Sequence, residues 1–298
     1  MQNFREQRRE SRDGNRTVIQ EPGRTIIRDG DRTIIRRNEN TRFEINARNV
    51  RQERRGTDTV TIVERQDGTR IVTVTDTDGR LLRRLRRDRN NRDVVIIDNT
   101  FRGPPGRNRT FFVNVPSPRI SIPRNRYIVD AEEVDEGVIY ETFMAPPVER
   151  IERSYSLDEV RYSPGLRDHM RRVDINTVNF ETGSWEVTPD GAARLKAVAD
   201  AIMRAVQDNP NEVFLIEGHT DAVGADLDNL SLSDRRAESV ALILTENYGV
   251  PPENLTTQGY GEQYLKVDTQ EASRENRRVT VRRITPLLSG QAAARPPR

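Results

Sequence analysis

An eight-residue repeat near the start of the chain sets the strongest limit on how it can fold. The unit occurs as Arg16-Thr-Val-Ile, Arg24-Thr-Ile-Ile and Arg32-Thr-Ile-Ile, with the turn dipeptides Pro22-Gly23 and Asp29-Gly30 between the copies. β-Branched triplets favour strands, and Asp-Gly and Pro-Gly favour tight turns. The repeat therefore predicts short antiparallel strands, arranged as a β-ribbon or as a small β-solenoid.

Strand-like segments and Asp-Gly turns continue to about residue 100. The strands are expected at Val60-Thr-Ile-Val, Arg70-Ile-Val-Thr-Val and Val94-Val-Ile-Ile, with turns at Asp67-Gly68 and Asp78-Gly79. We expect an arginine-rich β-repeat region over residues 16–100 and a disordered start over residues 1–15. Residues 101–170 contain Pro104-Pro105 and Pro146-Pro147, and are predicted to be a proline-rich linker with short elements, including a helix that begins at Ser156.

Composition limits the classes of function that the chain can have. Of its 298 residues, 34% are hydrophobic and 32% are charged, which is poor for a single large core. There are no cysteines, so disulfides, thiolate metal sites and a lipidated N-terminal cysteine are excluded. With only two histidines, no metal site and no cofactor are expected. Residues 1–10 lack the apolar core of a signal peptide, so an exported protein would need a signal that this sequence does not show.

Basic residues gather in the first half of the chain. Lysine and arginine total 49 against 47 acids, for a net charge of +2, and only Lys196 and Lys266 are lysines. The arginines can bind anionic envelope surfaces or nucleic acid, or they can simply keep exposed strand edges soluble. Phe43 is the only aromatic residue between Phe4 and Phe101, so base stacking is unsupported and no nucleic-acid partner is expected.

The last third of the chain alternates between strand and helix patterns. We expect strands from Val173, from Glu212, from Leu255 and from Arg278, and helices from Thr188 and from about Ser231. The order β-α-β-α-β-β predicts an α/β (α+β) sandwich over residues 171–286, with helices on one face of the sheet. Residues 287–298 are expected to be a disordered tail.

A candidate binding pair lies in the strand, polar loop and helix of residues 215–237. Asp221 and Arg236 are fifteen residues apart. A carboxylate accepts from an ammonium and a guanidinium grips a carboxylate, so together they can hold a zwitterionic amino-acid centre. The alternative is that Asp221 is a solvated turn acid and Arg236 a surface charge on the helix.

Four sequence blocks at ordered spacing resemble the OmpA-like C-terminal domain, and the likeness covers about residues 173–285. The blocks are Asn179-Phe-Glu-Thr-Gly-Ser, Gly218-His-Thr-Asp-Ala-Val-Gly, Leu232-Ser-Asp-Arg-Arg-Ala with Asn229 before it, and Leu255-Thr-Thr-Gln-Gly-Tyr-Gly-Glu with Asn276-Arg-Arg-Val after it. Gly261-Glu-Gln-Tyr-Leu-Lys-Val and the tail resemble forms of this domain from α-proteobacteria. The family pattern usually has a proline after Gly-Glu-x-x, where this chain has Leu265-Lys266.

The resemblance implies non-covalent binding of peptidoglycan through the diaminopimelate of its stem peptide. Asp221 then holds the free ammonium, and Arg236, rather than Arg235, holds the carboxylate. Supporting positions implied by the family are Thr182, Gly183, Thr220, Asn229 and Arg277. Asp226 and Asp228 are expected to be solvated acids.

Catalysis is not expected. Ser231, Ser233 and His219 lie near Asp221 in sequence, but there is no Gly-x-Ser-x-Gly elbow, and serines at a helix start are explained by capping. The predicted function is to tether the outer membrane or an envelope assembly to the cell wall, in the periplasm or at the outer membrane. Outer-membrane lipids or envelope proteins are possible partners of residues 1–147. The alternative is an arginine-rich scaffold or adhesive protein.

Overall fold

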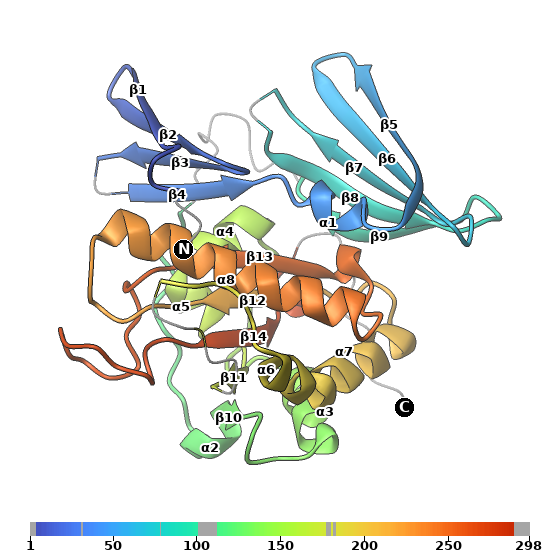
Figure 1. The fold of residues 1–298 in the computed structure, drawn as a ribbon. Helices are drawn as coiled ribbons and strands as arrows, with labels where there is room; N and C mark the ends of the chain where they lie inside the picture. Colours follow the sequence, from blue (N-terminus) through green and yellow to red (C-terminus); the bar gives the residue numbers. More distant parts are fainter. Residues whose placement is uncertain are drawn as a thin grey trace.

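Two antiparallel β-sheets stand on a mixed α/β unit (Figure 1). The computed structural model describes residues 4–30, 32–77, 79–100, 112–176, 180 and 183–288. The expectations for residues 1–3, for the prolines at 104 and 105, and for residues 289–298 lie outside this range. Leu287 and Leu288, which begin the expected tail, are buried.

The eight-residue repeat forms the first sheet, in the order β1-β2-β3-β4. Its strands are β1 (Arg9–Asp13), β2 (Arg16–Glu21), β3 (Arg24–Asp29) and β4 (Arg32–Arg37). Gly14, Gly23 and Gly30 have φ angles of 59°, 74° and 60°, the left-handed conformation that the turns require. The prediction of an antiparallel ribbon is confirmed. The solenoid alternative is wrong for this sheet, because its strands form an antiparallel meander of hairpins.

Strand β1 corrects the expectation of disorder at the start of the chain. All five of its residues are exposed, so no hydrophobic alternation marks it. It is held by antiparallel pairing with β2, in which Arg9 lies opposite Gln20 and Asp13 opposite Arg16. Backbone hydrogen bonds across a glycine turn are therefore sufficient to extend the sheet by one polar strand.

The second sheet is a five-stranded meander in the order β5-β6-β7-β8-β9. Its strands are β5 (Ala47–Arg55), β6 (Asp58–Arg65), β7 (Arg70–Thr75), β8 (Leu81–Arg87) and β9 (Asp93–Asp98). A short helix, α1 (Asn40–Phe43), connects the two sheets. Phe43 packs on Val63 and Ile71, so the connection is anchored in the apolar part of this sheet.

The C-terminal unit contains the third sheet, in the order β10-β11-β14-β12-β13. Its strands are β10 (Ile128–Asp130), β11 (Arg172–Ile175), β12 (Phe214–Gly218), β13 (Leu255–Gly259) and β14 (Val279–Arg283). The helices are α3 (Glu136–Met144), α6 (Pro189–Arg194), α7 (Lys196–Asp208) and α8 (Asp226–Glu246), with 3₁₀ turns at Pro252–Asn254 and Thr285–Leu287. The predicted order β-α-β-α-β-β is confirmed, and α8 begins five residues before the expected Ser231.

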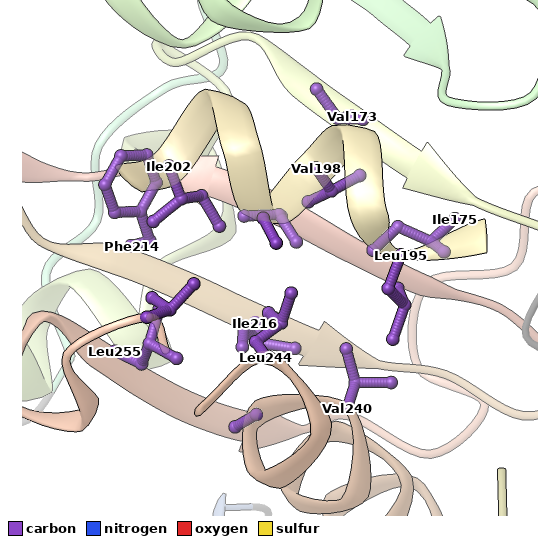
Figure 2. Close-up of a cluster of buried hydrophobic side chains, with 14 of the residues drawn as sticks. Val173, Ile175, Leu195, Val198, Ile202, Phe214, Ile216, Val240, Leu244 and Leu255 are labelled. Atoms are coloured by element: carbon purple, nitrogen blue, oxygen red, sulfur yellow. The ribbon is translucent and has the colours of Figure 1, made fainter. Parts of the chain in front are cut away.

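One face of this sheet is covered by helices α7 and α8 (Figure 2), and α3 adds Ile139 and Phe143 to the same core. Phe214 and Ile216 of β12 project between Ile202 of α7 and Val240 of α8, and all four are fully buried. Burying each such side chain contributes about 1.5–3 kcal/mol. This apolar layer holds the two helices in place on the sheet.

The opposite face of the sheet combines an apolar cluster with a buried charge network. Leu215 packs with Met170 and with Ile97 of β9, beneath the short helices α4 (Leu157–Tyr162) and α5 (Pro164–Arg167). The next residue on this face, Glu217, accepts from Arg282 Nε at 2.9 Å and pairs with Arg167 Nε at 2.9 Å.

The described part of residues 101–170 differs from a free linker. It does contain short elements, and α4 begins at Ser156 with a complete capping box to Glu159. Helix α2 (Arg124–Tyr127) leads into β10, which extends the C-terminal sheet, and Phe143 of α3 enters its core. The sequence does show strand character near Tyr127-Ile-Val, but a strand of only three residues does not predict the pairing of β10 with β11.

The two N-terminal sheets dock on the C-terminal unit through arginine–carboxylate pairs. Arg24 Nε lies 2.7 Å from Asp234 of α8, and Arg42 Nη1 lies 2.6 Å from Glu238. Glu39 accepts from Arg84 and, at 2.7 Å, from Arg161. Most of these side chains are almost completely buried, so the arginines of this interface neutralise the chain's own acids.

The buried carboxylate of Glu217 makes the free energy of unfolding depend on pH. Burial alone raises the pKa of Glu217, but Arg282 and Arg167 outweigh it and lower the pKa to about 2 from the usual 4.5. A lowered carboxyl pKa stabilises the fold above pH 4.5, and the gain is lost as the pH falls to 2. The stabilisation that is lost amounts to about 3 kcal/mol. In urea unfolding, we expect the stability difference between wild type and Glu217→Gln to shrink between pH 7 and pH 2; a difference that does not change with pH would contradict this.

Glu39 is the central carboxylate of the docking interface. Glu39→Gln leaves the buried guanidiniums of Arg84 and Arg161 without their counter-charge, which is expected to cost about 3–5 kcal/mol. The matched control is Arg16→Gln, because the Arg16–Asp29 pair is exposed and contributes less than about 1 kcal/mol. Chemical denaturation at pH 7 measures both. Equal effects of the two substitutions would show that the buried pairs do not hold the sheets in place.

Candidate ligand-binding site

Asp221 lies in the loop that follows strand β12. Its Oδ2 accepts from Arg277 Nη1 at 2.6 Å and from the backbone N–H of Ser273 at 3.3 Å. The side chain is mostly buried, at 10% exposure. Within the described residues, these contacts fall on Oδ2, so Oδ1 is the oxygen that an incoming cation can meet.

Arg236 projects from the third turn of helix α8 and is buried. Its Nε donates to the carbonyl of Ser184 at 3.0 Å, and its guanidinium carbon lies 4.8 Å from the centre of the Phe180 ring. The hydrogen bond and the ring hold the guanidinium plane in one orientation. The neighbouring Arg235 points elsewhere, because it pairs with Glu21 and stacks over Trp185 at 5.0 Å.

The charges of Asp221, Arg236 and Arg277 interact. Burial and, to a smaller extent, the charge of Arg277 lower the pKa of Arg236, Asp221 opposes both, and the net value is about 10. Two guanidiniums thus share one carboxylate in this site. An additional anion beside Arg236 would offset the burial of its charge, which is the electrostatic condition for binding a carboxylate.

Asn229 ties the loop to the start of helix α8. Its Nδ2 lies within hydrogen-bond distance of the Asp221 carbonyl at 3.3 Å and the Val223 carbonyl at 3.2 Å, and it also donates to Glu262 Oε2 at 2.6 Å. The backbone N–H of Thr220 donates to the Gly261 carbonyl at 2.9 Å. Both residues shape the loop that carries Asp221.

Asn276 closes the loop in which Leu265-Lys266 departs from the family pattern. Its Oδ1 accepts from the N–H groups of Lys266 and Val267 at 2.7 and 2.9 Å, and its Nδ2 donates back to the Val267 carbonyl at 2.8 Å. Lys266 Nζ lies 3.0 Å from Asp174. A non-proline residue is therefore accommodated by side-chain bonds, directly before Arg277.

Helix α8 crosses strands β12 and β13 at unusually short range. A Cβ on Gly218 would lie 1.9 Å from the Ser233 carbonyl oxygen, and one on Gly259 would lie 2.3 Å from the Asp234 nitrogen. Only glycine permits this approach. The contact fixes the separation between Arg236, on the helix, and Asp221, three residues beyond Gly218.

Among the residues predicted for the site, Asp221, Arg236, Arg277 and Asn229 come together. Thr220 is buried beside them. Gly183 has a φ of 72° and immediately precedes Ser184, whose carbonyl meets Arg236. Thr182 lies outside the described residues.

Several contacts of the site carry no side-chain signal in the sequence. Ser184 and Ser273 act through the backbone, which any residue supplies. Trp185 lies next to Phe4 at 5.9 Å, so the start of the chain packs at the rim of the site. In the sequence, Phe4 is an isolated aromatic residue, and nothing near it predicts its contact with Trp185.

The expectations for the nearby polar residues need two corrections. Asp228 is not simply solvated, because it pairs with Arg5 at 3.1 Å and Arg8 at 2.9 Å. The serines do not cap α8, which begins at Asp226: Ser231 donates to Glu21, and Ser233 donates to the Leu230 carbonyl at 2.8 Å. Asp228 is paired because the start of the chain packs against α8. The serines lie inside the helix because α8 begins earlier than expected.

His219 has a structural environment. Its ring stacks on Tyr260 at 5.7 Å. Burial, with Arg278 and other nearby arginines, holds its pKa well below the usual 6.5, so it is neutral. Within the described ranges, no group of acids and histidines could hold a metal ion, and no helix there is long and apolar enough to cross a membrane.

Comparison with known proteins identifies the family of the part of the chain that carries this site. The family model of the OmpA family matches residues 179–278, which include every described member of the site from Phe180 to Arg277. YfiB of Escherichia coli (strain K12) is 42% identical over 113 residues, which cover 37% of this chain and 68% of YfiB. The chain belongs to the OmpA family.

Two further relatives each match about a third of this chain. Outer membrane porin F of Pseudomonas aeruginosa is 36% identical over 110 residues, which cover 36% of this chain and 30% of the porin. The peptidoglycan-associated lipoprotein of Buchnera aphidicola is 35% identical over 86 residues, which cover 29% of this chain and 47% of the lipoprotein. The chain thus spans less than half the length of either. By their names these relatives are outer-membrane or cell-wall-associated proteins, in agreement with the expectation that the chain is not an enzyme.

The close approach of α8 is testable by a single methyl group. Gly218→Ala forces the helix away from β12 and is expected to cost about 1–3 kcal/mol or more of stability. The control is Gly137→Ala in α3, where the nearest atom to the new Cβ is a side-chain oxygen of Asp135 at 3.2 Å and the change stays within about 1 kcal/mol. Thermal or urea unfolding compares them. Wild-type stability in Gly218→Ala would contradict the packing described.

Proposed function

We propose that the OmpA-family part of the chain binds peptidoglycan through the diaminopimelate of its stem peptide. The observation that carries the proposal is the juxtaposition of Asp221 and Arg236, each buried and oriented by neighbouring groups. The relative named for association with peptidoglycan, 35% identical over 86 residues, supports peptidoglycan as the ligand. Residues 171–286 are the proposed limits of the binding domain.

Diaminopimelate suits this pair because its free end presents an ammonium and a carboxylate on one carbon. Asp221 would accept from the ammonium, with Arg277 holding the carboxylate in place from the other side. Arg236 would donate to the ligand carboxylate. A stem peptide with lysine at this position lacks the second carboxylate, so the cost of burying Arg236 would not be offset.

In this proposal, the protein tethers an envelope assembly to the cell wall on the periplasmic side of the outer membrane. Binding requires no cofactor and makes no covalent bond. The two N-terminal sheets would then be carried on the binding domain as one rigid attachment, since the buried pairs of Arg24 and Arg42 join them to helix α8.

Sedimentation with purified sacculi tests the ligand pair. We expect Asp221→Ala and Arg236→Ala each to reduce the bound fraction at least about tenfold, because truncating one partner of a buried charged contact costs roughly 2–5 kcal/mol of binding. Arg235→Ala is the matched control: it removes a charge from the adjacent position of the same helix, and it should retain binding. Circular dichroism verifies that each variant is folded.

The chemistry of the stem peptide is tested with the unmodified protein. Sacculi that contain diaminopimelate should bind, and sacculi that contain lysine at the same position should bind at least about tenfold more weakly. Equal binding to both would reject diaminopimelate recognition. Binding that survives in folded Asp221→Ala and Arg236→Ala would reject the assignment of these residues.

A further inference from the structure

Strand β1 is a free edge of the first sheet. It pairs with β2 on one side, and among the described residues no strand pairs with its other side. All five residues of β1 are exposed. In Figure 1 strand β4 lies next to the C-terminal unit, and β1 forms the opposite edge of the sheet. A free edge offers backbone donors and acceptors to another strand.

The turn between β1 and β2 determines which backbone groups face outward. Only two residues separate the strands, so Asp13, which ends β1, exchanges backbone hydrogen bonds with β2. Bonded positions alternate along an antiparallel ladder, so the backbones of Ser11 and Arg9 also face β2. The N–H and C=O groups of Glu10 and Arg12 therefore point outward from the sheet.

The charged side chains of β1 have no ion-pair partner among the described residues. They are Arg9, Glu10, Arg12 and Asp13. The adjacent strand differs, because Arg16 of β2 pairs with Asp29 of β3 at 2.9 Å. Two positive and two negative charges are therefore available along the free edge.

The order of these charges is complementary to itself in the antiparallel direction. The strand reads Arg9-Glu-Ser-Arg-Asp13. If a second copy lies antiparallel with its Ser11 opposite Ser11, Arg9 meets Asp13 and Glu10 meets Arg12, and each pair occurs twice. Opposite charges at directly opposed positions stabilise strand pairing. The outward backbone groups also meet their counterparts in this register.

The two nearest alternative registers bring like charges together. Shifting the copy by two residues, which keeps the backbone groups matched, places Glu10 opposite Glu10 in one direction and Arg12 opposite Arg12 in the other. Like charges at directly opposed positions are destabilising. Charges on an edge strand usually prevent pairing with another copy, but here they select one register.

The exposed edge of the second sheet does not have this property. Strand β5 carries four arginines and a single acid, Glu53. That acid already pairs with Arg51 at 2.9 Å and with Arg55 at 3.1 Å. Two copies of β5 would repel each other, so β1 is the edge that fits a second copy.

We propose that β1 pairs with β1 of a second copy, so that the two four-stranded sheets form one continuous antiparallel sheet around a two-fold axis at Ser11. Glu10 lies opposite Ile19 of β2, which packs against Leu230 of α8, so this face of the sheet carries the C-terminal unit. The two C-terminal units then lie on the same side of the joined sheet. Five residues per chain make a small contact, so the pairing is reversible.

A single cysteine at the two-fold axis tests this pairing in the full chain, which has no cysteine of its own. Ser11→Cys places two thiols at a non-hydrogen-bonded pair, where the Cα atoms are about 4.5 Å apart, a separation that a disulfide can span. In a glutathione redox buffer, the covalent dimer should form at least about tenfold faster from Ser11→Cys than from Asn49→Cys, on the exposed strand β5. Non-reducing electrophoresis measures both rates.

Charge reversal tests the register. Glu10→Arg, added to Ser11→Cys, puts like charges opposite each other at two positions and should slow dimer formation to the rate of the Asn49→Cys control. Adding Arg12→Glu as well makes the opposed charges unlike again and should restore the fast rate. A nearby arginine favours the thiolate, so slowing by Glu10→Arg cannot come from a less reactive thiol.

Fluorescence of Trp185, the single tryptophan of the chain and a neighbour of Phe4, verifies in each variant that the start of the chain stays in place. Dimer formation by Ser11→Cys at the control rate would overturn the proposal and leave β1 as an edge protected by its charges. A fast rate that Glu10→Arg does not slow, or a slowed rate that Arg12→Glu does not restore, would also overturn it, because opposed charges would then not set the register.

Discussion

The approach of helix α8 to strands β12 and β13 is the constraint on which the rest of the molecule depends. Gly218 and Gly259 let the helix backbone come within a distance that any Cβ would block. The sheet side of this contact ends in the Asp221 loop, and the helix side carries Arg236. The separation of the two charges is therefore set by backbone packing, which is stiffer than a contact between two long side chains.

The same helix is also where the N-terminal sheets attach. Asp234 accepts from the N–H of Gly259 at 3.1 Å and from Arg24 at 2.7 Å, so one carboxylate joins the helix to a strand of its own unit and to a strand of the first sheet. Leu230 packs against Ile19, Ile26 and Ile35 of that sheet. One face of α8 serves the sheet beneath it and the adjoining face serves the docked sheet.

The arginines at the docking interface are balanced by acids of the same chain. In the docking interface most guanidiniums meet acids of the same chain, as Arg42 meets Glu238. The sequence supplies an acid for nearly every base, 47 against 49, for a net charge of +2.

The sequence predicts the elements that have a strong period or turn signal and misses those that depend on tertiary contact. The hairpins from Arg16, the helix opened by Thr188 and Pro189, and the sequence of strands and helices along the C-terminal unit are all readable. Strand β1 has no apolar pattern, the pairing of the three-residue β10 with β11 leaves no sequence signal, and the first turn of α8 is stabilised by Arg5 and Arg8 from the far end of the chain.

In the candidate site too, the sequence predicts some of the residues and misses others. Asp221, Arg236 and Arg277 stand in motifs and could be named, and the structure brings them together. Contacts made by backbone groups, such as the Ser184 carbonyl and the Ser273 N–H, could not be named because they leave no mark on residue identity. The docking of the sheets is unreadable for a similar reason, since pairs such as Arg24 with Asp234 join residues 210 positions apart.

The most direct test of the central claim is to observe the two charges meeting one ligand. In a nuclear magnetic resonance titration of the full chain with a stem tripeptide that ends in diaminopimelate, the Arg236 Nε–H signal and the backbone amides of Asp221 and Ser273 should shift together, with one saturation curve. A tripeptide ending in lysine should leave the Arg236 signal in place. Saturable shifts that avoid both Asp221 and Arg236 would contradict the account.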